Sequence, residues 1–208
     1  MLRRIAVAAA GVVLVLAGCS AGAEPGQGGT AEAGAGETAA ASATGAPSSG
    51  VAGKLAAYDL DGLEADQIVD ELDRLPLAER PDDLMASVRV DQLVLSDGED
   101  ELAMELPTDR FYVSVAPFVD QTHECFYHSL TTCTGELGGE DVQVTIVDEA
   151  GEVLVDEQTT TYDNGFVGFW LPREVAGTNR VSYDGLEGEA EFSTTDDGAT
   201  CVTTLQLA

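Results

Sequence analysis

Basic residues are scarce in this sequence. Nine Lys and Arg stand against 38 Asp and Glu in 208 residues, which gives a formal net charge of -29. Binding to nucleic-acid phosphates depends on clustered Lys and Arg, and the chain holds a single lysine, Lys54. The composition therefore excludes a nucleic-acid partner. It favours solubility and the attraction of cations instead.

Several catalytic and metal-binding motifs are also missing. The sequence has no Gly-x-Ser-x-Gly element and no His-Glu-x-x-His element, so the common hydrolase signatures are absent. It has no Cys-x-x-Cys pair, which argues against a thiol-disulfide oxidoreductase. Its acidic pairs lack the EF-hand pattern of a calcium site.

Residues 1–18 are predicted to be a lipoprotein signal peptide. Arg3 and Arg4 supply a positive start, and the apolar run over 5–17 is too short to span a membrane. The sequence Leu16-Ala17-Gly18-Cys19 resembles the bacterial lipobox, in which the cysteine becomes the acylated first residue. Cys19 is therefore the predicted lipidation site. The mature chain is expected outside the cytoplasm, anchored to the cell membrane by this lipid.

The rest of the chain divides into a tether and two predicted domains. Residues 19–53 comprise the acylated cysteine and a Gly/Ala-rich tether, expected to be disordered because it has few side chains with which to form a core. Residues 54–108 are predicted to be a small α+β domain. In it, 63–75 has the apolar spacing of a helix with Asp61 as its N-cap, 82–86 is a candidate second helix, and a hairpin follows.

Residues 109–208 show short strands separated by turn signals such as Asn164-Gly165 and Asp184-Gly185. About seven strands at this spacing predict an all-β antiparallel sandwich, and the order of turns resembles the prealbumin-like type. The predicted fold class is thus an α+β unit followed by this sandwich. The fold alone implies no function.

The metal-capable side chains are concentrated in one segment. His123, Cys125, His128 and Cys133 fall within eleven residues, and Cys201 lies in the predicted last strand, on a face expected to point inward. Three thiols cannot all pair within one chain. Cys125 and Cys133 would be about 26 Å apart in a straight strand and about 12 Å apart in a helix. Either a turn near 129–132 folds Cys133 back, or Cys133 meets Cys201 from another strand.

The donor types favour copper. Two or three thiolates without four paired ligands suit Cu(I) better than structural zinc, and imidazoles could receive Cu(II). Two thiolates that close to a disulfide release two electrons, enough to convert two Cu(II) to Cu(I). Cys125, Cys133 and Cys201 are accordingly the candidate residues for a thiol-dependent cupric reductase activity, and His123 and His128 are further candidate ligands.

The same region resembles a known family. The run Phe111–Val119, the run from Gln121 to Cys133 and the run Gly135–Leu137 are similar to the signature of the CueP family of periplasmic copper-binding proteins. The resemblance implies copper resistance, copper binding through Cys133 and Cys201 with Cys125 as an auxiliary thiol, and assistance in reducing Cu(II). It also implies a homodimer and delivery of copper to an exported enzyme such as a superoxide dismutase. The lipobox and tether depart from that pattern and favour a tethered copper trap or reductase.

A competing interpretation needs no metal. Cys133 and Cys201 could form an ordinary disulfide inside the sandwich, and the histidines could be polar loop residues. The chain would then be a structural or adhesive lipoprotein β-sandwich.

Overall fold

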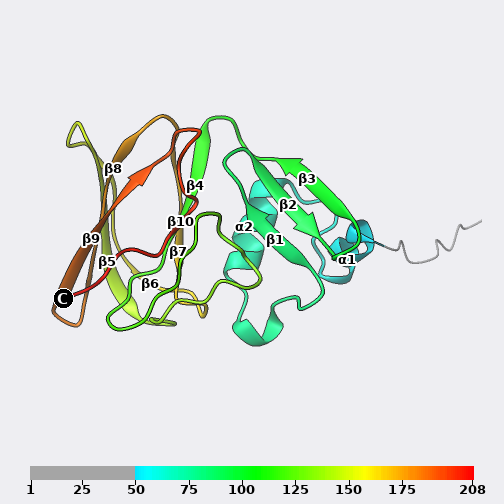
Figure 1. Cartoon of the computed structure of the whole chain (residues 1–208), viewed down its shortest axis with the longest axis horizontal. Coiled ribbons are helices and arrows are strands. Elements are labelled where there is room, and N and C mark those ends of the chain that lie inside the picture. The colour runs from blue at the N-terminus through cyan, green and yellow to red at the C-terminus, as the bar shows by residue number, and fades with distance from the viewer. Residues whose placement is uncertain (1–49) are drawn as a thin grey trace, which may run out of the picture. The chain divides into compact units, whose positions relative to one another are not determined.

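The computed structural model describes residues 50–208. The predicted signal peptide, Cys19 and the tether up to residue 49 lie outside the described residues. In the described part, no helix combines the length and the apolar character needed to cross a bilayer. Figure 1 shows two helices and a small sheet in the first half of this part, followed by two further sheets.

The elements follow one another in a simple order. The helical elements are α1 (Val51–Ala57), α2 (Ala65–Asp73) and the 3-10 helix η1 (Leu77–Glu79). The first sheet is formed by β1 (Met85–Val88), β2 (Gln92–Ser96) and β3 (Glu101–Glu105). The remaining strands are β4 (Arg110–Val115), β5 (Asp141–Asp148), β6 (Val153–Thr160), β7 (Val167–Pro172), β8 (Ala176–Tyr183), β9 (Leu186–Ser193) and β10 (Cys201–Val202).

The helix α2 forms where the apolar spacing predicts it, but its cap differs. Glu64 is the N-cap, and its side chain and that of Gln67 form a reciprocal capping box. The prediction of Asp61 as N-cap is therefore wrong. Ile68 and Leu72 lie on the apolar face of this helix and are fully buried. Tertiary packing therefore stabilises a helix of only nine residues.

Two local predictions fail in the first half. The segment 82–86 is not a helix, because Met85 and Ala86 begin β1 and pair with β2 in antiparallel register. In addition, α1 begins at Val51, inside the stretch predicted to be tether. Val51 and Leu55 are buried in the core of this half, so tertiary contacts stabilise a helix that the Gly/Ala-rich composition does not indicate.

The second half contains two sheets, with strand orders β10-β4-β7 and β6-β5-β8-β9. The predicted α+β class is confirmed, whereas the prealbumin-like arrangement of seven strands stays a prediction. One pairing differs from the expected antiparallel pattern, because β10 pairs with β4 in parallel. Strand β10 has only two residues, but Cys201 is buried in agreement with the inward face predicted for it.

Three groups of buried side chains hold the described residues together. One lies between the two later sheets and includes Phe111 and Ile146, and another lies beneath α1, α2 and the first sheet. The third and smallest contains Ala116, Cys133, Phe166 and Cys201, with Cys125 packed against it. Two of the thiols are therefore part of a hydrophobic core, and the third borders it.

Candidate metal centre

The segment 121–128 has no regular secondary structure, and the edge of β1 holds its C-terminal end. The backbone N–H of Val88 donates to the carbonyl of His128 at 2.8 Å, and the N–H of Leu130 donates to the carbonyl of Ala86 at 2.9 Å. These bonds cover an exposed sheet edge and fix the backbone of His128.

A turn then brings Cys133 back toward Cys125. The N–H of Cys133 donates to the carbonyl of Ser129 at 3.1 Å, and the residues between them form the turn. The Sγ atoms of Cys125 and Cys133 are 3.5 Å apart as a result. This turn is the first of the two arrangements that the sequence leaves open. The structure combines it with the second, because Cys133 also lies close to Cys201.

Cys201 reaches the same place from β10. The carbonyl of Phe126 accepts the N–H groups of Thr200 and Cys201, which ties the segment to the start of the strand. The Thr200 hydroxyl donates to the carbonyl of Val88 and accepts the N–H of His128 at 2.9 Å. The Cys201 Sγ consequently lies 3.7 Å from His128 Nδ1.

The five predicted ligands gather in two overlapping groups. The ligand atoms of His123, Cys125 and Cys133, the outer group, lie within 4.8 Å of one another. Those of His128, Cys133 and Cys201, the inner group, do so as well. Cys133 belongs to both groups. All three of these cysteines are free thiols in the structure, so the disulfide of the competing interpretation is not formed.

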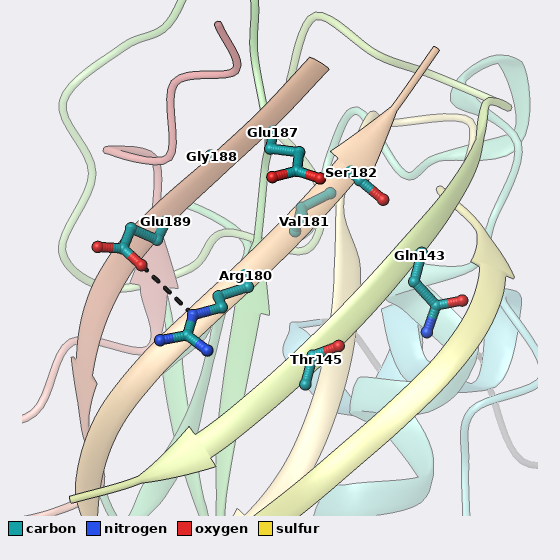
Figure 2. A pocket seen from close by; sticks show the side chains of 8 residues that line it. All are labelled: Gln143, Thr145, Arg180, Val181, Ser182, Glu187, Gly188 and Glu189. Carbon is teal, nitrogen blue, oxygen red and sulfur yellow. Dashed lines mark hydrogen bonds and ion pairs between the residues drawn. The ribbon is translucent and has the colours of Figure 1, made fainter. Parts of the chain in front are cut away.

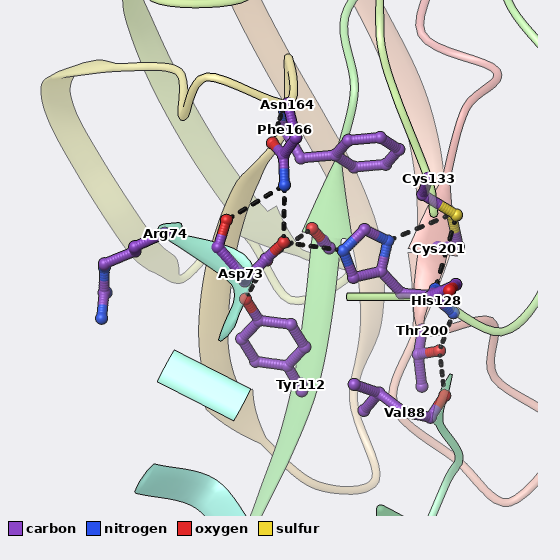
Figure 3. Close-up of polar contacts among 12 residues, drawn as sticks. Asp73, Arg74, Val88, Tyr112, His128, Cys133, Asn164, Phe166, Thr200 and Cys201 are labelled. Atoms are coloured by element: carbon purple, nitrogen blue, oxygen red, sulfur yellow. Dashed lines mark hydrogen bonds and ion pairs between the residues drawn. The ribbon is translucent and has the colours of Figure 1, made fainter. Parts of the chain in front are cut away.

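Asp73 supports His128 from the opposite side and was not predicted from the sequence. Figure 3 shows the imidazole between the Asp73 carboxylate and the thiols. Asp73 Oδ1 lies 2.9 Å from His128 Nε2 and accepts the Asn164 amide at 2.8 Å. Its Oδ2 accepts the hydroxyls of Tyr112 at 2.5 Å and Ser114 at 3.3 Å. Because Nε2 is engaged by the carboxylate, Nδ1 is the nitrogen that faces sulfur.

The local sequence contains a signal for Asp73. It lies four residues after Val69 and therefore on the buried face of α2, where a carboxylate is costly unless it is paired. It is also the last residue of the helix, where the helix dipole disfavours a negative charge. An acidic residue in both situations indicates a buried partner. That partner is fully buried His128.

The charges within the site follow from these contacts. Burial opposes the charged form of His128, but the Asp73 carboxylate outweighs it and raises the pKa of His128 to about 9. The pKa of Asp73 is lowered by the same pair, despite its burial. The Cys133 pKa lies well below that of an ordinary thiol, because Cys125 and Cys201 hydrogen-bond to it and His128 is near. Cys133 is therefore the thiolate of the site.

The other two thiols remain protonated. The hydrogen bond to Cys133 raises the pKa of Cys125 to about 11. The pKa of Cys201 is raised as well, through its contacts with Cys125 and Cys133 and through burial. Three sulfur atoms and two histidine rings form a donor set that suits Cu(I), and metal binding would release protons from the thiols and from His128.

The broad hollow on the four-stranded sheet is unrelated to these residues. It lies over β5, β8 and β9, and the ion pair of Arg180 with Glu189 forms part of its lining (Figure 2). It contains no thiol or histidine, and its open, polar surface shows no group with metal-binding chemistry beyond exposed carboxylates. The candidate chemistry of the described residues is at the cysteines.

Comparison with known proteins identifies the family. The family model described as periplasmic copper-binding protein CueP matches residues 67–206. The chain belongs to the CueP family. A solved structure titled "Crystal Structure of S.CueP" is 41% identical, with a TM-score of 0.71, and the match covers 76% of this chain and 96% of that chain. A search of the curated proteins gave no match.

Membership of the CueP family confirms the resemblance and its coarse implications. The family binds copper and is periplasmic, so a copper-binding function and an extracytoplasmic location are both supported for this chain. The matched region contains all five predicted ligands and Asp73. Cys19 precedes it.

Proposed function

We propose that this protein is a copper-binding lipoprotein that holds Cu(I) through Cys133 and Cys201 for copper resistance outside the cytoplasm. The observation that carries the proposal is the convergence of His128, Cys133 and Cys201, whose ligand atoms lie within 4.8 Å of one another. Cys125 is the auxiliary thiol, 3.5 Å from Cys133. Thiolate and imidazole donors of this kind select Cu(I) over hard cations.

His128, Cys133 and Cys201 have different roles in binding Cu(I). Cys133 is the thiolate with which Cu(I) first forms a bond. Cys201 loses its proton when it becomes the second thiolate ligand. His128 offers Nδ1, because Asp73 engages Nε2 on the other side of the ring. The copper ion is the cargo of this site, and the protein's own contribution is to hold three donors at the right spacing.

The same thiols can supply electrons to Cu(II). Two thiolates close to one disulfide and release two electrons, and two Cu(II) ions each take one electron to become Cu(I). Cys125 and Cys133 have sulfur atoms 3.5 Å apart, and Cys133 and Cys201 share the inner group, so Cys133 is the common partner of either disulfide. Repeated turnover requires an external thiol reductant.

The lipobox supports anchoring at Cys19, and the tether supports a domain held near the outer face of the membrane. Transfer of the copper to an exported copper enzyme and formation of a homodimer are further parts of the proposal that rest on the family resemblance. Anchoring is tested by metabolic labelling with an alkyne fatty acid. The wild-type chain should be labelled and the Cys19→Ser variant should not.

Copper binding is tested by titrating the reduced full chain, purified in detergent, with Cu(I) against a competing chelator. Free thiols are counted before and after Cu(II) is added. Tight stoichiometric Cu(I) binding, with loss of two thiols per two Cu(I) formed, supports binding and reduction together. Binding without thiol loss removes the redox part. Absence of binding by the reduced chain, together with two oxidised thiols in the chain as isolated, would favour the structural lipoprotein.

The ranking of the thiols is a specific prediction. Cys133→Ser and Cys201→Ser should each lower Cu(I) affinity by more than the roughly 10–100-fold that loss of an outer-sphere partner costs. Cys125→Ser should weaken affinity less, because Cys125 lies outside the inner group. Thr204→Ala is the matched control, since Thr204 is an exposed neighbour with no metal-binding group. Equal losses from all three serine variants would contradict the ranking and indicate a trithiolate site.

A further inference from the structure

The two ligand groups differ in their access to solvent. His123 and Cys125 are partly exposed, whereas Cys201 is 2% exposed and His128 is fully buried. Cys133 lies between these extremes at 9% and belongs to both groups. The groups therefore form a series from the surface to the interior, with one shared sulfur.

Two hollows in the surface meet at the outer group. One is lined by Gln121, Thr122, His123, Thr134, Gly135 and Glu136. The other includes His123 and Cys125 in its wall, together with Phe118 and Thr204. His128 and Cys201 line neither hollow. An ion that arrives from solvent through either one consequently meets His123 before it meets the inner group.

The two histidines differ in their hydrogen-bond partners. His128 is fixed at both ends of its ring, by Asp73 and by its contact with Cys201. His123 Nε2 is enclosed and has no hydrogen-bond partner. An enclosed nitrogen without a partner is costly unless it gains a ligand. Phe166 packs near both rings, with centroid distances of 6.2 Å to His123 and 4.5 Å to His128, and so gives them a common apolar neighbour.

We propose that copper passes through two overlapping subsites, an entry subsite of His123, Cys125 and Cys133 and a retention subsite of His128, Cys133 and Cys201. This inference rests on the proposed Cu(I)-binding function and describes how the ion reaches its final ligands. Because Cys133 is common to both subsites, the ion keeps one Cu–S bond throughout and is never released as a free ion.

The transfer is a ligand exchange without a change of oxidation state. The bond from Cu(I) to the Cys125 sulfur breaks while the bond to the Cys201 sulfur forms. Cys201 gives up its thiol proton, and the protonated ring of His128 gives up its Nδ1 proton before that nitrogen binds. Cys125 takes up one of these protons as it leaves the ion, and the other passes to solvent, so charge and protons balance. The imidazole of His123 is replaced by that of His128. Because the ligand atoms of each group lie within 4.8 Å of one another and both groups include Cys133, the ion needs only a short displacement.

With two subsites, the rate of copper capture and the Cu(I) affinity at equilibrium depend on different residues. The full chain in detergent is mixed with the Cu(I) complex of a chromophoric chelator in a stopped-flow instrument, which gives the rate of copper capture. Titration of the same protein against the same chelator then gives the Cu(I) affinity at equilibrium. His123→Gln and Cys125→Ser alter the entry subsite. Cys201→Ser alters the retention subsite with little change in volume, and Thr204→Ala is the control in the wall of the same hollow.

The entry variants should slow copper capture by about tenfold or more, while equilibrium affinity changes by less than about threefold. Cys201→Ser should keep the fast capture phase and lose affinity by about 100-fold or more. Parallel losses of rate and affinity in all three ligand variants would overturn the relay and indicate a single site. If the wild-type chain binds no Cu(I), the proposed function itself fails, which is a different result.

Discussion

Replacement of Asp73 by Ala tests whether this carboxylate organises the centre. Its two oxygens accept four side-chain donors, from His128, Asn164, Tyr112 and Ser114. The variant leaves all four without their acceptor in a region from which water is excluded. The carboxylate is also one partner of a buried ion pair with His128, both members of which are 0–1% exposed.

The expected cost follows from these contacts. Removing one member of a buried ion pair destabilises a protein by about 3–5 kcal/mol, because the other charge stays buried without compensation. Asp73→Ala should lower the free energy of unfolding by that amount. Asp73→Asn keeps one acceptor oxygen and should cost about 1.5–3 kcal/mol, the range for hydrogen bonds to charged groups.

The single tryptophan provides the assay. Trp170 lies with its ring centroid 4.9 Å from that of Tyr112, so its fluorescence reports on the packing around Asp73. Urea unfolding of the reduced protein gives the midpoint and slope, and a shift of midpoint at constant slope measures stability. Glu71→Ala is the control, since Glu71 is an exposed neighbour in α2 and should change stability by at most about 0.5 kcal/mol.

Two results would refute the reasoning. Asp73→Ala within about 1 kcal/mol of the wild type would show that the four donors find other acceptors at little cost. An Asp73→Asn variant that folds and holds Cu(I) as tightly as the wild type would show that Asp73 does not position His128. The expected loss of Cu(I) affinity is about 10–100-fold, as for other partners behind a metal-binding histidine.

Two further stability predictions concern the second half of the described residues. Gly165→Ala should destabilise the protein by more than about 1 kcal/mol in urea unfolding, because Gly165 has φ 79° and a Cβ there would lie 2.7 Å from the Gly135 backbone. An unchanged midpoint would show that the loop moves freely. Asn179→Val should raise stability by about 1–3 kcal/mol, because the fully buried Asn179 side chain has no hydrogen-bond partner. A lower melting temperature would show that its amide is satisfied by water.

The thiol-rich part of the site was predictable because its residues are close in the sequence. His123, Cys125, His128 and Cys133 lie within eleven residues, and Cys201 could be assigned to an inward face by the alternation of the last segment. The sequence left open whether Cys133 turns back toward Cys125 or meets Cys201, and the structure combines the two. Spacing alone could not show this, since the turn depends on the bonds of Ala86 and Val88 to this segment.

The polar support of the site was not predictable in the same way. Asn164 was interpreted as the first residue of an Asn-Gly turn, and its side chain in fact donates to Asp73, which is 91 residues away. Such a contact has no local signature. Likewise, residues 85 and 86 have no property that excludes a helix, but pairing with β2 on one side and with 128–130 on the other makes them a strand.

The anchoring of the ligands bears on how copper could leave the site. In small zinc domains the metal ion replaces a core, and metal binding and folding are one event. Here each ligand is held by contacts that involve only protein atoms: His128 by Asp73 and Thr200, Cys133 by the turn from Ser129, and Cys201 by the carbonyl of Phe126. The two large cores are likewise formed by side chains alone. Departure of the ion therefore costs its own bonds but not the fold.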